Sequence, residues 1–138
     1  MIRSAVVALL ITTLGACGNP AEAAPPAKAD PLAAETKAWK AAQPVFEKYC
    51  AHCHTEGGAK ATKKKLNRFN FTAYPPSGSH AKTIGTAIRG VLGLDGGKQK
   101  MPADKPGSVT GDDLAHLKAW ADAWDAADKA GAHAAASH

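Results

Sequence analysis

The stretch Lys48–His54, KYCAHCH, decides how this chain is interpreted. It contains two cysteines with two residues between them, and a histidine directly follows the second cysteine. This arrangement is compatible with a zinc site, with a redox-active dithiol, or with two thiols that bind a haem covalently while the histidine binds its iron. The composition and the remaining motifs distinguish among these three kinds of site.

The N-terminal segment has the features of an export signal. Arg3 provides a positive charge, and Ala5–Leu14 form an apolar run of about ten residues, which is too short to span a bilayer as a finished helix. The run ends in Leu14–Cys17, LGAC, which resembles the lipobox of bacterial lipoprotein signal peptides. In that family the signal is cut before the cysteine, so the resemblance implies removal of residues 1–16 and lipidation of Cys17. The alternative is an ordinary secretory signal that happens to contain a cysteine.

The lipoprotein resemblance also implies a location. A lipidated protein of this kind faces the periplasm and is held at the membrane by its acyl chains, each buried methylene contributing about 0.8 kcal/mol. Gly18 follows the cysteine, whereas the family's signal for retention in the inner membrane is an aspartate at that position, so Gly18 favours the outer membrane. Residues 17–34 are rich in alanine and proline and are expected to form an extended, lipidated tether.

Covalent haem binding is the interpretation of the CxxCH motif that the cysteine content favours. With Cys17 lipidated, Cys50 and Cys53 are the remaining cysteines, too few for a zinc site of three or four thiolates, and no second ligand pair is present. A redox dithiol is expected after a strand in a βαβ unit, and the sequence predicts no strand. Two thiols at this spacing reach the two vinyl groups of one porphyrin, and His54 then reaches its iron. We therefore expect one covalently attached haem c, with Cys50 and Cys53 as tethers and His54 as an axial ligand.

The composition fits a small domain with a cofactor in its interior. The chain has 138 residues, 45% of them hydrophobic but only 6% aromatic, and alanine buries little area per residue. A porphyrin would supply the missing apolar surface. The formal charge of +5 favours docking to acidic partner proteins and not binding to nucleic acid. No Ser-His-Asp set, carboxylate pair or phosphate-binding loop is visible in the sequence, so neither an enzyme nor a small-molecule substrate is predicted.

Hydrophobic periodicity predicts an all-α chain. A first helix is expected over residues 31–39, with Asp30 as its cap. Pro44 is expected to interrupt this helix before a second helical stretch enters the CxxCH motif. A middle helix is expected over residues 79–92, and the Gly93–Leu94 pair that follows is typical of a Schellman-type end.

The last helix is expected to open at Thr110, where the pattern Thr110-x-x-Asp113 is typical of a capping box. Its apolar face carries two tryptophans, which are most simply core residues. Residues 55–78 and 93–109 show no periodicity. Loops of this length in a compact domain ordinarily wrap a ligand or serve a function.

The second axial ligand is predicted to be Met101. Once the signal peptide is removed it is the single methionine of the chain, 47 residues beyond His54. It lies in a glycine-rich loop, where Pro102 stiffens the backbone. A thioether opposite an imidazole gives the iron a raised potential, which suits electron transfer. Three alternatives stay open at this point: Met101 fills a gap in the core, His80 binds the iron, or the iron has an open site.

These features together resemble the class I monohaem cytochrome c family over about residues 43–126. The resemblance rests on a helix that ends in CxxCH, a wrapping loop, a middle helix, a Met-Pro loop and a C-terminal helix, in that order. It implies an all-α, cytochrome c-like fold of three to four helices around one covalently bound haem. It also implies that the first and last helices cross, with Phe46 or Tyr49 packed against Leu117 or Trp120.

The chain departs from this family at the carbonyl that orients the histidine. The family often has Gly-Pro soon after the motif, and the proline carbonyl accepts the imidazole N–H. Here Gly57–Gly58 occupies that region and no proline follows until Pro75. The acceptor for His54 is therefore open at this point, although some acceptor is expected.

The motifs and the resemblance together predict the function. Residues 35–128 are expected to form the cytochrome domain and residues 129–138 a disordered tail. The expected function is electron transfer in the periplasm by Fe(III)/Fe(II) cycling, with redox proteins as partners and no enzymatic reaction. The alternatives are a ligand-binding or sensor protein with an open sixth site, and the haem subunit of a larger oxidoreductase.

Two groups of basic residues have simpler interpretations than a role at the haem. The Lys63–Lys65 run is either a docking patch or a solvated charge run. Arg89 is more simply a surface residue than a partner of a haem propionate.

Overall fold

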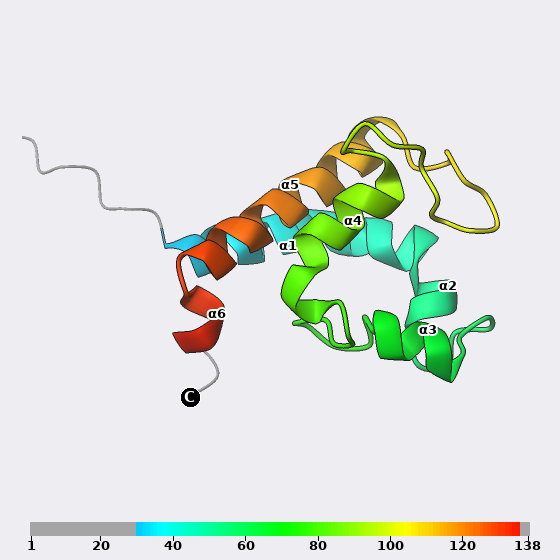
Figure 1. The fold of residues 1–138 in the computed structure, drawn as a ribbon, viewed down its shortest axis with the longest axis horizontal. Helices are drawn as coiled ribbons and strands as arrows, with labels where there is room; N and C mark the ends of the chain where they lie inside the picture. Colours follow the sequence, from blue (N-terminus) through cyan, green and yellow to red (C-terminus); the bar gives the residue numbers. More distant parts are fainter. Residues whose placement is uncertain (1–29, 136–138) are drawn as a thin grey trace, which may run out of the picture.

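The structure is a computed structural model, and it describes residues 30–135 (Figure 1). The predicted signal peptide, Cys17 and nearly all of the predicted tether lie outside these residues, as do residues 136–138. Within the described part of the chain, no helix combines the length and the apolar character that crossing a membrane requires.

The described chain is all-α, which confirms the predicted fold class. Its elements are α1 (Pro31–Tyr49), α2 (Ala51–His54), α3 (Lys63–Arg68), the 3-10 helix η1 (Ala81–Thr83), α4 (Ile84–Leu92), α5 (Gly111–Lys129) and α6 (Ala132–Ala135). Between residues 30 and 135 the one strand-like pairing is an isolated antiparallel bridge between Asn70 and Ser77. Helix α5 packs against both α1 and α4, and α2 and α3 extend from the C-terminal end of α1 (Figure 1).

The core forms where α1, α4 and α5 meet. Phe46 of α1 packs edge-to-face on Trp120 of α5, with ring centroids 5.0 Å apart, which confirms the expected contact between the first and last helices. Trp39 packs against both rings, with its centroid 5.3 Å from each. Aromatic pairs of this kind contribute about 0.5–1.5 kcal/mol beyond the burial of their area. Trp120 and Trp124 are both buried, as the sequence predicted.

The proline in α1 does not interrupt the helix, so that prediction is wrong. Asp30 caps α1 as expected, its side chain accepting a hydrogen bond from the Leu32 N–H at 3.0 Å. Pro44 is exposed and lies inside the helix, where it removes one backbone donor. Burial of Val45 and Phe46 in the core offsets that loss, since burying one large apolar side chain stabilises a fold by about 1.5–3 kcal/mol.

Helix α4 ends in the predicted Schellman motif. Gly93 has a φ of +71°, and the Leu94 N–H donates to the Arg89 carbonyl at 2.9 Å. A Cβ at Gly93 would lie 2.7 Å from the Gly97 carbonyl oxygen, so both the backbone conformation and the available space require glycine. The N-terminal part of the expected helix is instead η1, and α4 itself begins at Ile84.

Helix α5 begins after Thr110, as predicted, but the expected capping box does not form. The Thr110 side chain makes no capping hydrogen bond. Asp113 instead accepts hydrogen bonds from Lys48 Nζ and Tyr49 Oη, both at 2.9 Å. Because its carboxylate is bound by α1, Asp113 joins the C-terminal end of α1 to the first turn of α5.

Helix α3 lies within the stretch 55–78, where the sequence predicted irregular chain. Thr62 caps it, because the Thr62 Oγ1 accepts a hydrogen bond from the Lys65 N–H at 3.3 Å. A helix of 6 residues is too short to show a hydrophobic period. The sequence therefore contains no periodic signal from which α3 could be predicted.

The C-terminal helix α6 lies where a disordered tail was expected. Its His133 pairs with the buried Glu35 of α1, with 2.6 Å between Nε2 and Oε2, and stacks at an angle on Trp124 with ring centroids 4.1 Å apart. Tyr74 also donates a hydrogen bond to Glu35. The chain is thus helical as far as Ala135, and His133 packs on the domain.

Candidate haem site

The CxxCH motif lies on one helical turn at the end of α1. Cys50 is the C-terminal cap of α1, and its N–H donates to the Phe46 carbonyl at 2.8 Å. The N–H groups of Cys53 and His54 both donate to the Cys50 carbonyl, at 3.1 and 2.9 Å. The short helix α2 therefore brings two thiols, both free, and one imidazole together.

The imidazole of His54 is oriented by a backbone carbonyl. His54 Nδ1 lies 3.0 Å from the Phe69 carbonyl oxygen, and the Phe71 N–H donates back to the His54 carbonyl at 2.8 Å. In the tautomer that donates from Nδ1, Nε2 keeps the lone pair that a metal ion requires. The acceptor that the sequence left open is thus Phe69, which lies 15 residues beyond His54 and carries no proline signature.

The environment of the Cys50 thiol does not favour its reactive thiolate form. Burial, and to a smaller extent the charge of Cys53, raises the pKa of the Cys50 thiol to about 12. Redox-active dithiols instead contain a thiol whose pKa is lowered, because the thiolate is the reactive form. Among residues 30–135, no group of three or more His, Cys, Asp or Glu side chains is placed to hold a metal ion.

Met101 lies in the middle of the loop between α4 and α5. The N–H groups of Met101 and Lys100 both donate to the Val91 carbonyl near the end of α4, at 3.1 and 2.7 Å. Met101 is half-buried and is not one of the buried core residues, which disfavours its role as a gap-filling core methionine. The competing ligand, His80, stacks on Phe69 with ring centroids 5.2 Å apart.

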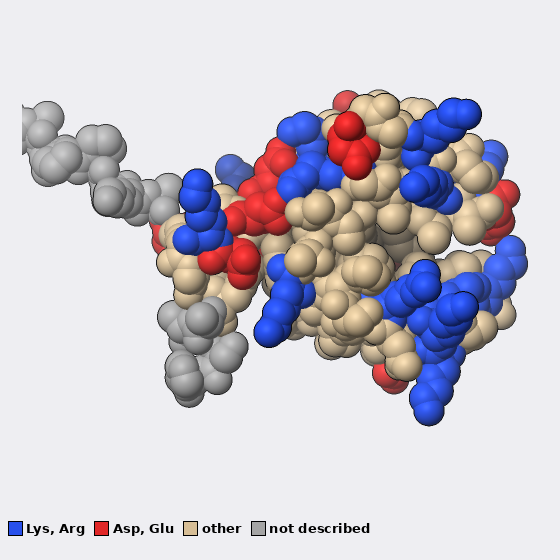
Figure 2. Space-filling model, in the orientation of Figure 1, with Lys and Arg blue, Asp and Glu red and all other residues tan. Residues whose placement is uncertain are grey.

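Apolar side chains around the motif are only half-buried. They pack against the core yet keep part of their surface exposed, and they include Cys50, Phe69, Phe71, Val91 and Leu94. Figure 2 shows the surface hollowed between α3 and the loop that follows α4. A planar apolar group would remove such surface from water. The side chains present, two thiols and one oriented imidazole with a half-exposed apolar lining, therefore fit a covalently bound haem.

Arg89 of α4 is bound by protein carboxylates. Its guanidinium lies 3.1 Å from Asp122 Oδ1 and also pairs with Asp125. Gly85 allows the close approach of the two helices, since a Cβ there would lie 2.6 Å from the Ala121 carbonyl oxygen. Arg89 thus joins α4 to α5, and its half-buried side chain is bound by carboxylates of the protein itself.

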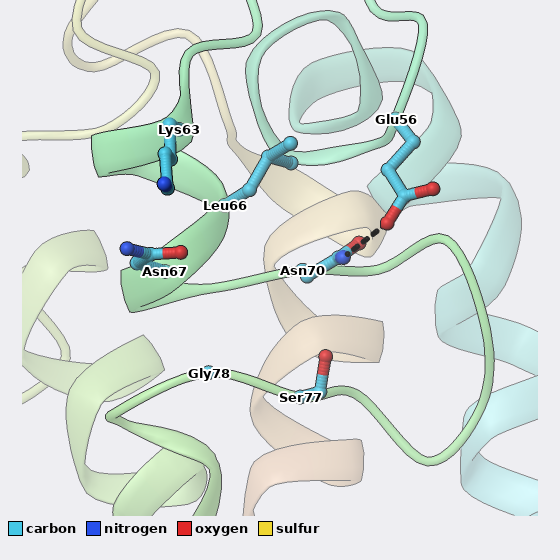
Figure 3. Close-up of a pocket in the computed structure, with 7 residues that line it drawn as sticks. All are labelled: Glu56, Lys63, Leu66, Asn67, Asn70, Ser77 and Gly78. Atoms are coloured by element: carbon cyan, nitrogen blue, oxygen red, sulfur yellow. Dashed lines mark hydrogen bonds between the residues drawn. The ribbon is translucent and has the colours of Figure 1, made fainter.

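A polar hollow lies beside α3 (Figure 3). It is lined by Glu56, Lys63, Leu66, Asn67, Asn70, Ser77 and Gly78. The Asn70 side-chain amide donates to the Glu56 carboxylate at 3.2 Å, which joins the segment after the motif to the loop that contains Phe69. Neither the cysteines of the motif nor His54 nor Met101 lines this hollow, so the candidate ligands do not meet there.

Basic side chains gather over α3, close to the motif (Figure 2). Lys65 Nζ lies 2.6 Å from the Lys60 carbonyl oxygen and 3.6 Å from Cys53 Sγ. Lys60 in turn pairs with Asp104 of the Met101 loop at 3.1 Å. The Lys60–Asp104 pair joins the segment after the motif to the loop that contains Met101. The sequence gives no signal for this long-range contact.

The chain matches a known family over most of its described residues. The family described as "Cytochrome C oxidase, cbb3-type, subunit III" matches residues 37–120. The matched segment contains the CxxCH motif, the Phe69 carbonyl that orients His54, and Met101. No curated protein and no solved structure matches the chain significantly.

Proposed function

Because the chain belongs to the family of cytochrome c oxidase subunit III of the cbb3 type, matched over residues 37–120, we propose that it is a single-haem electron carrier at the periplasmic side of a bacterial membrane. Membership of this family implies a monohaem c-type cytochrome domain with covalently bound haem c, which exchanges electrons with redox partners. The proposal adds the ligands of the iron, the location, and the kind of partner surface.

Four side chains hold the haem in this proposal. Cys50 and Cys53 would hold the haem through thioether bonds to its vinyl groups, and His54 and Met101 would bind its iron. The bound haem supplies one-electron cycling between Fe(III) and Fe(II), with a higher potential than two imidazole ligands would give. The protein's own contribution would be to supply both protein ligands to the iron, which would leave no site for a small-molecule substrate.

The contact between His54 Nδ1 and the Phe69 carbonyl, at 3.0 Å, is the observation that carries the proposal. Histidines that bind a metal ion almost always donate their other ring N–H to a carbonyl, a carboxylate or water. This hydrogen bond fixes the ring orientation and increases the basicity of Nε2. It therefore supports His54 as an axial ligand.

The proposed partner surface is acidic, because Figure 2 shows basic side chains gathered over α3 and over the loop that follows α4, on both sides of the hollow. Exposed lysines of these two segments and of the chain just before α3 are Lys60, Lys63, Lys64, Lys98, Lys100 and Lys105. Opposite charges on a partner would speed the encounter, and added salt would weaken the attraction. The proposed membrane anchor rests on the sequence alone, through the lipobox resemblance at Cys17.

A second candidate function is that of a haem subunit in a larger oxidoreductase. The family description favours it, since it names a subunit of an oxidase. The same haem site would then pass electrons within a complex instead of between separate proteins. Purification of the full chain from membranes distinguishes the two: a subunit stays bound to a membrane oxidase at high salt, whereas a carrier is recovered alone.

Optical spectra of the haem-loaded protein test the ligand assignment. Oxidised wild type should have the weak band near the red end of the spectrum that marks a sulfur ligand. Met101→Ala should lose this band because the thioether is removed, and His80→Ala, the matched control, should keep it. Loss of the band in His80→Ala alone would contradict the assignment. A high-spin wild type that binds carbon monoxide would indicate a ligand-binding or sensor protein.

A further inference from the structure

The loop that contains Met101 is closed at its base by the side chain of Gln99. Gln99 Oε1 accepts a hydrogen bond from the Val109 N–H at 3.3 Å, and Nε2 donates to the Val109 carbonyl at 3.1 Å. Nε2 also lies 3.5 Å from the Leu92 carbonyl at the end of α4. One side-chain amide thus binds both backbone groups of Val109 and joins the two ends of residues 100–108.

The base and the tip of this loop differ in burial. Val109 is 1% exposed and Leu92 is 6% exposed, whereas residues 103–107 are exposed. Hydrogen bonds at a buried base compete less with water than bonds at an exposed tip. The hydrogen bonds at the base of the loop are therefore the more stable ones. Met101 follows Gln99 by two positions, so it lies at that base and not at the tip.

The other contacts of the loop are of two kinds. The Val91 carbonyl accepts the Lys100 and Met101 N–H groups at 2.7 and 3.1 Å, which fixes one end of the loop only. The Lys60–Asp104 pair joins side chains that are 53% and 54% exposed, and pairs this exposed contribute little. Gln99 is thus the side chain that connects both ends of the loop to the core.

We propose that Gln99 is a positioning residue that keeps the Met101 loop closed and thereby determines how firmly Met101 stays on the iron. This inference rests on the proposed ligation by Met101. Opening of the loop would take the thioether away from the iron, and an added ligand such as imidazole would bind the open form. The apparent affinity for imidazole is therefore proportional to the population of that form.

Imidazole titration of the oxidised, haem-loaded full chain tests this role. Each hydrogen bond lost without replacement changes an equilibrium about two- to tenfold, so Gln99→Ala should bind imidazole about tenfold more tightly than wild type. Gln99→Glu keeps the acceptor for the Val109 N–H but loses the donor to the Val109 carbonyl, and should show an increase as well. Gln43→Ala is the control, because Gln43 is an exposed glutamine whose amide bonds only within its own helix, to Glu47 at 3.0 Å. Wild-type affinity in both Gln99 variants would overturn the inference.

Amide hydrogen exchange separates this inference from the ligand assignment. The Lys100 and Met101 amides should exchange about tenfold faster in Gln99→Ala than in wild type, while the amides of α1 keep their rates. If wild type lacks the sulfur band, the assignment of Met101 fails, and exchange at the loop still decides the role of Gln99. Unchanged exchange in both Gln99 variants would overturn the inference. If Gln99→Ala does not accumulate in cells, exchange in Gln99→Glu provides the same test.

Discussion

Single side chains near the helix ends determine how the helices of this protein are joined. Asp113 has the position of a capping residue at the start of α5, but its carboxylate accepts hydrogen bonds from Lys48 and Tyr49 of α1. Tyr49 immediately precedes the first proposed tether, Cys50. The contact therefore holds the end of α1 where the motif begins, a role that the pattern of α5 alone does not indicate.

The ionisation of Asp113 should make the stability of the fold depend on pH. Hydrogen bonds from Lys48 and then from Tyr49 lower the pKa of the Asp113 carboxyl. A carboxyl with a lowered folded pKa stabilises the fold above its unfolded pKa of about 3.9, and this contribution is lost as the pH falls through the folded pKa. Wild type should therefore lose more free energy of unfolding than Asp113→Asn between about pH 6 and about pH 3, measured by urea unfolding of the haem-loaded protein.

The neighbouring residue provides the control for this experiment. Asp112 is exposed in the same helical turn, so Asp112→Asn should show the same loss as wild type. An equal loss in wild type and Asp113→Asn would contradict the prediction, because it would show that the ionisation of Asp113 is not coupled to folding.

At the scale of elements, the long helix α1 shows that tertiary packing outweighs a helix-breaking residue. Pro44 lies inside the helix and is exposed, so its replacement removes no packing. A proline costs about 3 kcal/mol relative to alanine in a helix interior, and part of this cost is offset because proline also restricts the unfolded chain. We expect Pro44→Ala to raise the free energy of unfolding by about 1–2 kcal/mol, measured by urea unfolding.

Pro106 is the matched control for this prediction. It is exposed in the Met101 loop, outside any helix, so Pro106→Ala should not stabilise the protein, because there it only frees the unfolded chain. A lower stability of Pro44→Ala than of wild type would contradict the prediction, and would mean that the proline shapes α1 for its contact with α5.

The helices that could be predicted are those that are long or clearly terminated. The Asp30 cap of α1 and the Gly93 end of α4 follow from residue types that favour particular backbone conformations. The start of α5 after Thr110 was predicted from the pattern of a capping box, although the box itself does not form. Helices α3 and α6, with 6 and 4 residues, have no period to detect. Their presence depends on contacts with distant parts of the chain, such as that of His133 with Glu35.

At the scale of the whole molecule, the candidate site also has one part that the local sequence predicts and another part that depends on contacts between distant residues. Cys50, Cys53 and His54 lie within five consecutive residues, so their chemistry could be inferred from the sequence. The acceptor of His54 is a backbone carbonyl at Phe69, and every residue type has one. The contact of Gln99 with Val109 likewise arises only once the chain is folded.

Buried and half-buried side chains connect the candidate site to the rest of the fold. Glu35 is 3% exposed. It binds Tyr74, which lies in the loop between α3 and η1, and His133 of α6. The same loop begins near Phe69, whose carbonyl orients His54. Near the motif, however, apolar side chains such as Phe69 and Phe71 are only partly covered by protein, so the core is incomplete at that end of the molecule.

The incomplete end predicts that the fold depends on its haem. Small domains bury a low fraction of their surface and have little stability to lose, and a bound group that is absent from the unfolded chain adds its binding free energy to the folded state. The double variant Cys50→Ala, Cys53→Ala cannot attach haem covalently. It should show less helix by circular dichroism than wild type and a broader urea transition at lower urea, because α2, α3 and the Met101 loop would lose the group that the proposal places beside them. Met101→Ala, which keeps both cysteines, should retain a cooperative transition.

The double variant could instead unfold as sharply as wild type and at the same urea concentration. The helices α1, α4 and α5 would then be sufficient for the fold, and the haem would be bound by a domain that is already complete without it.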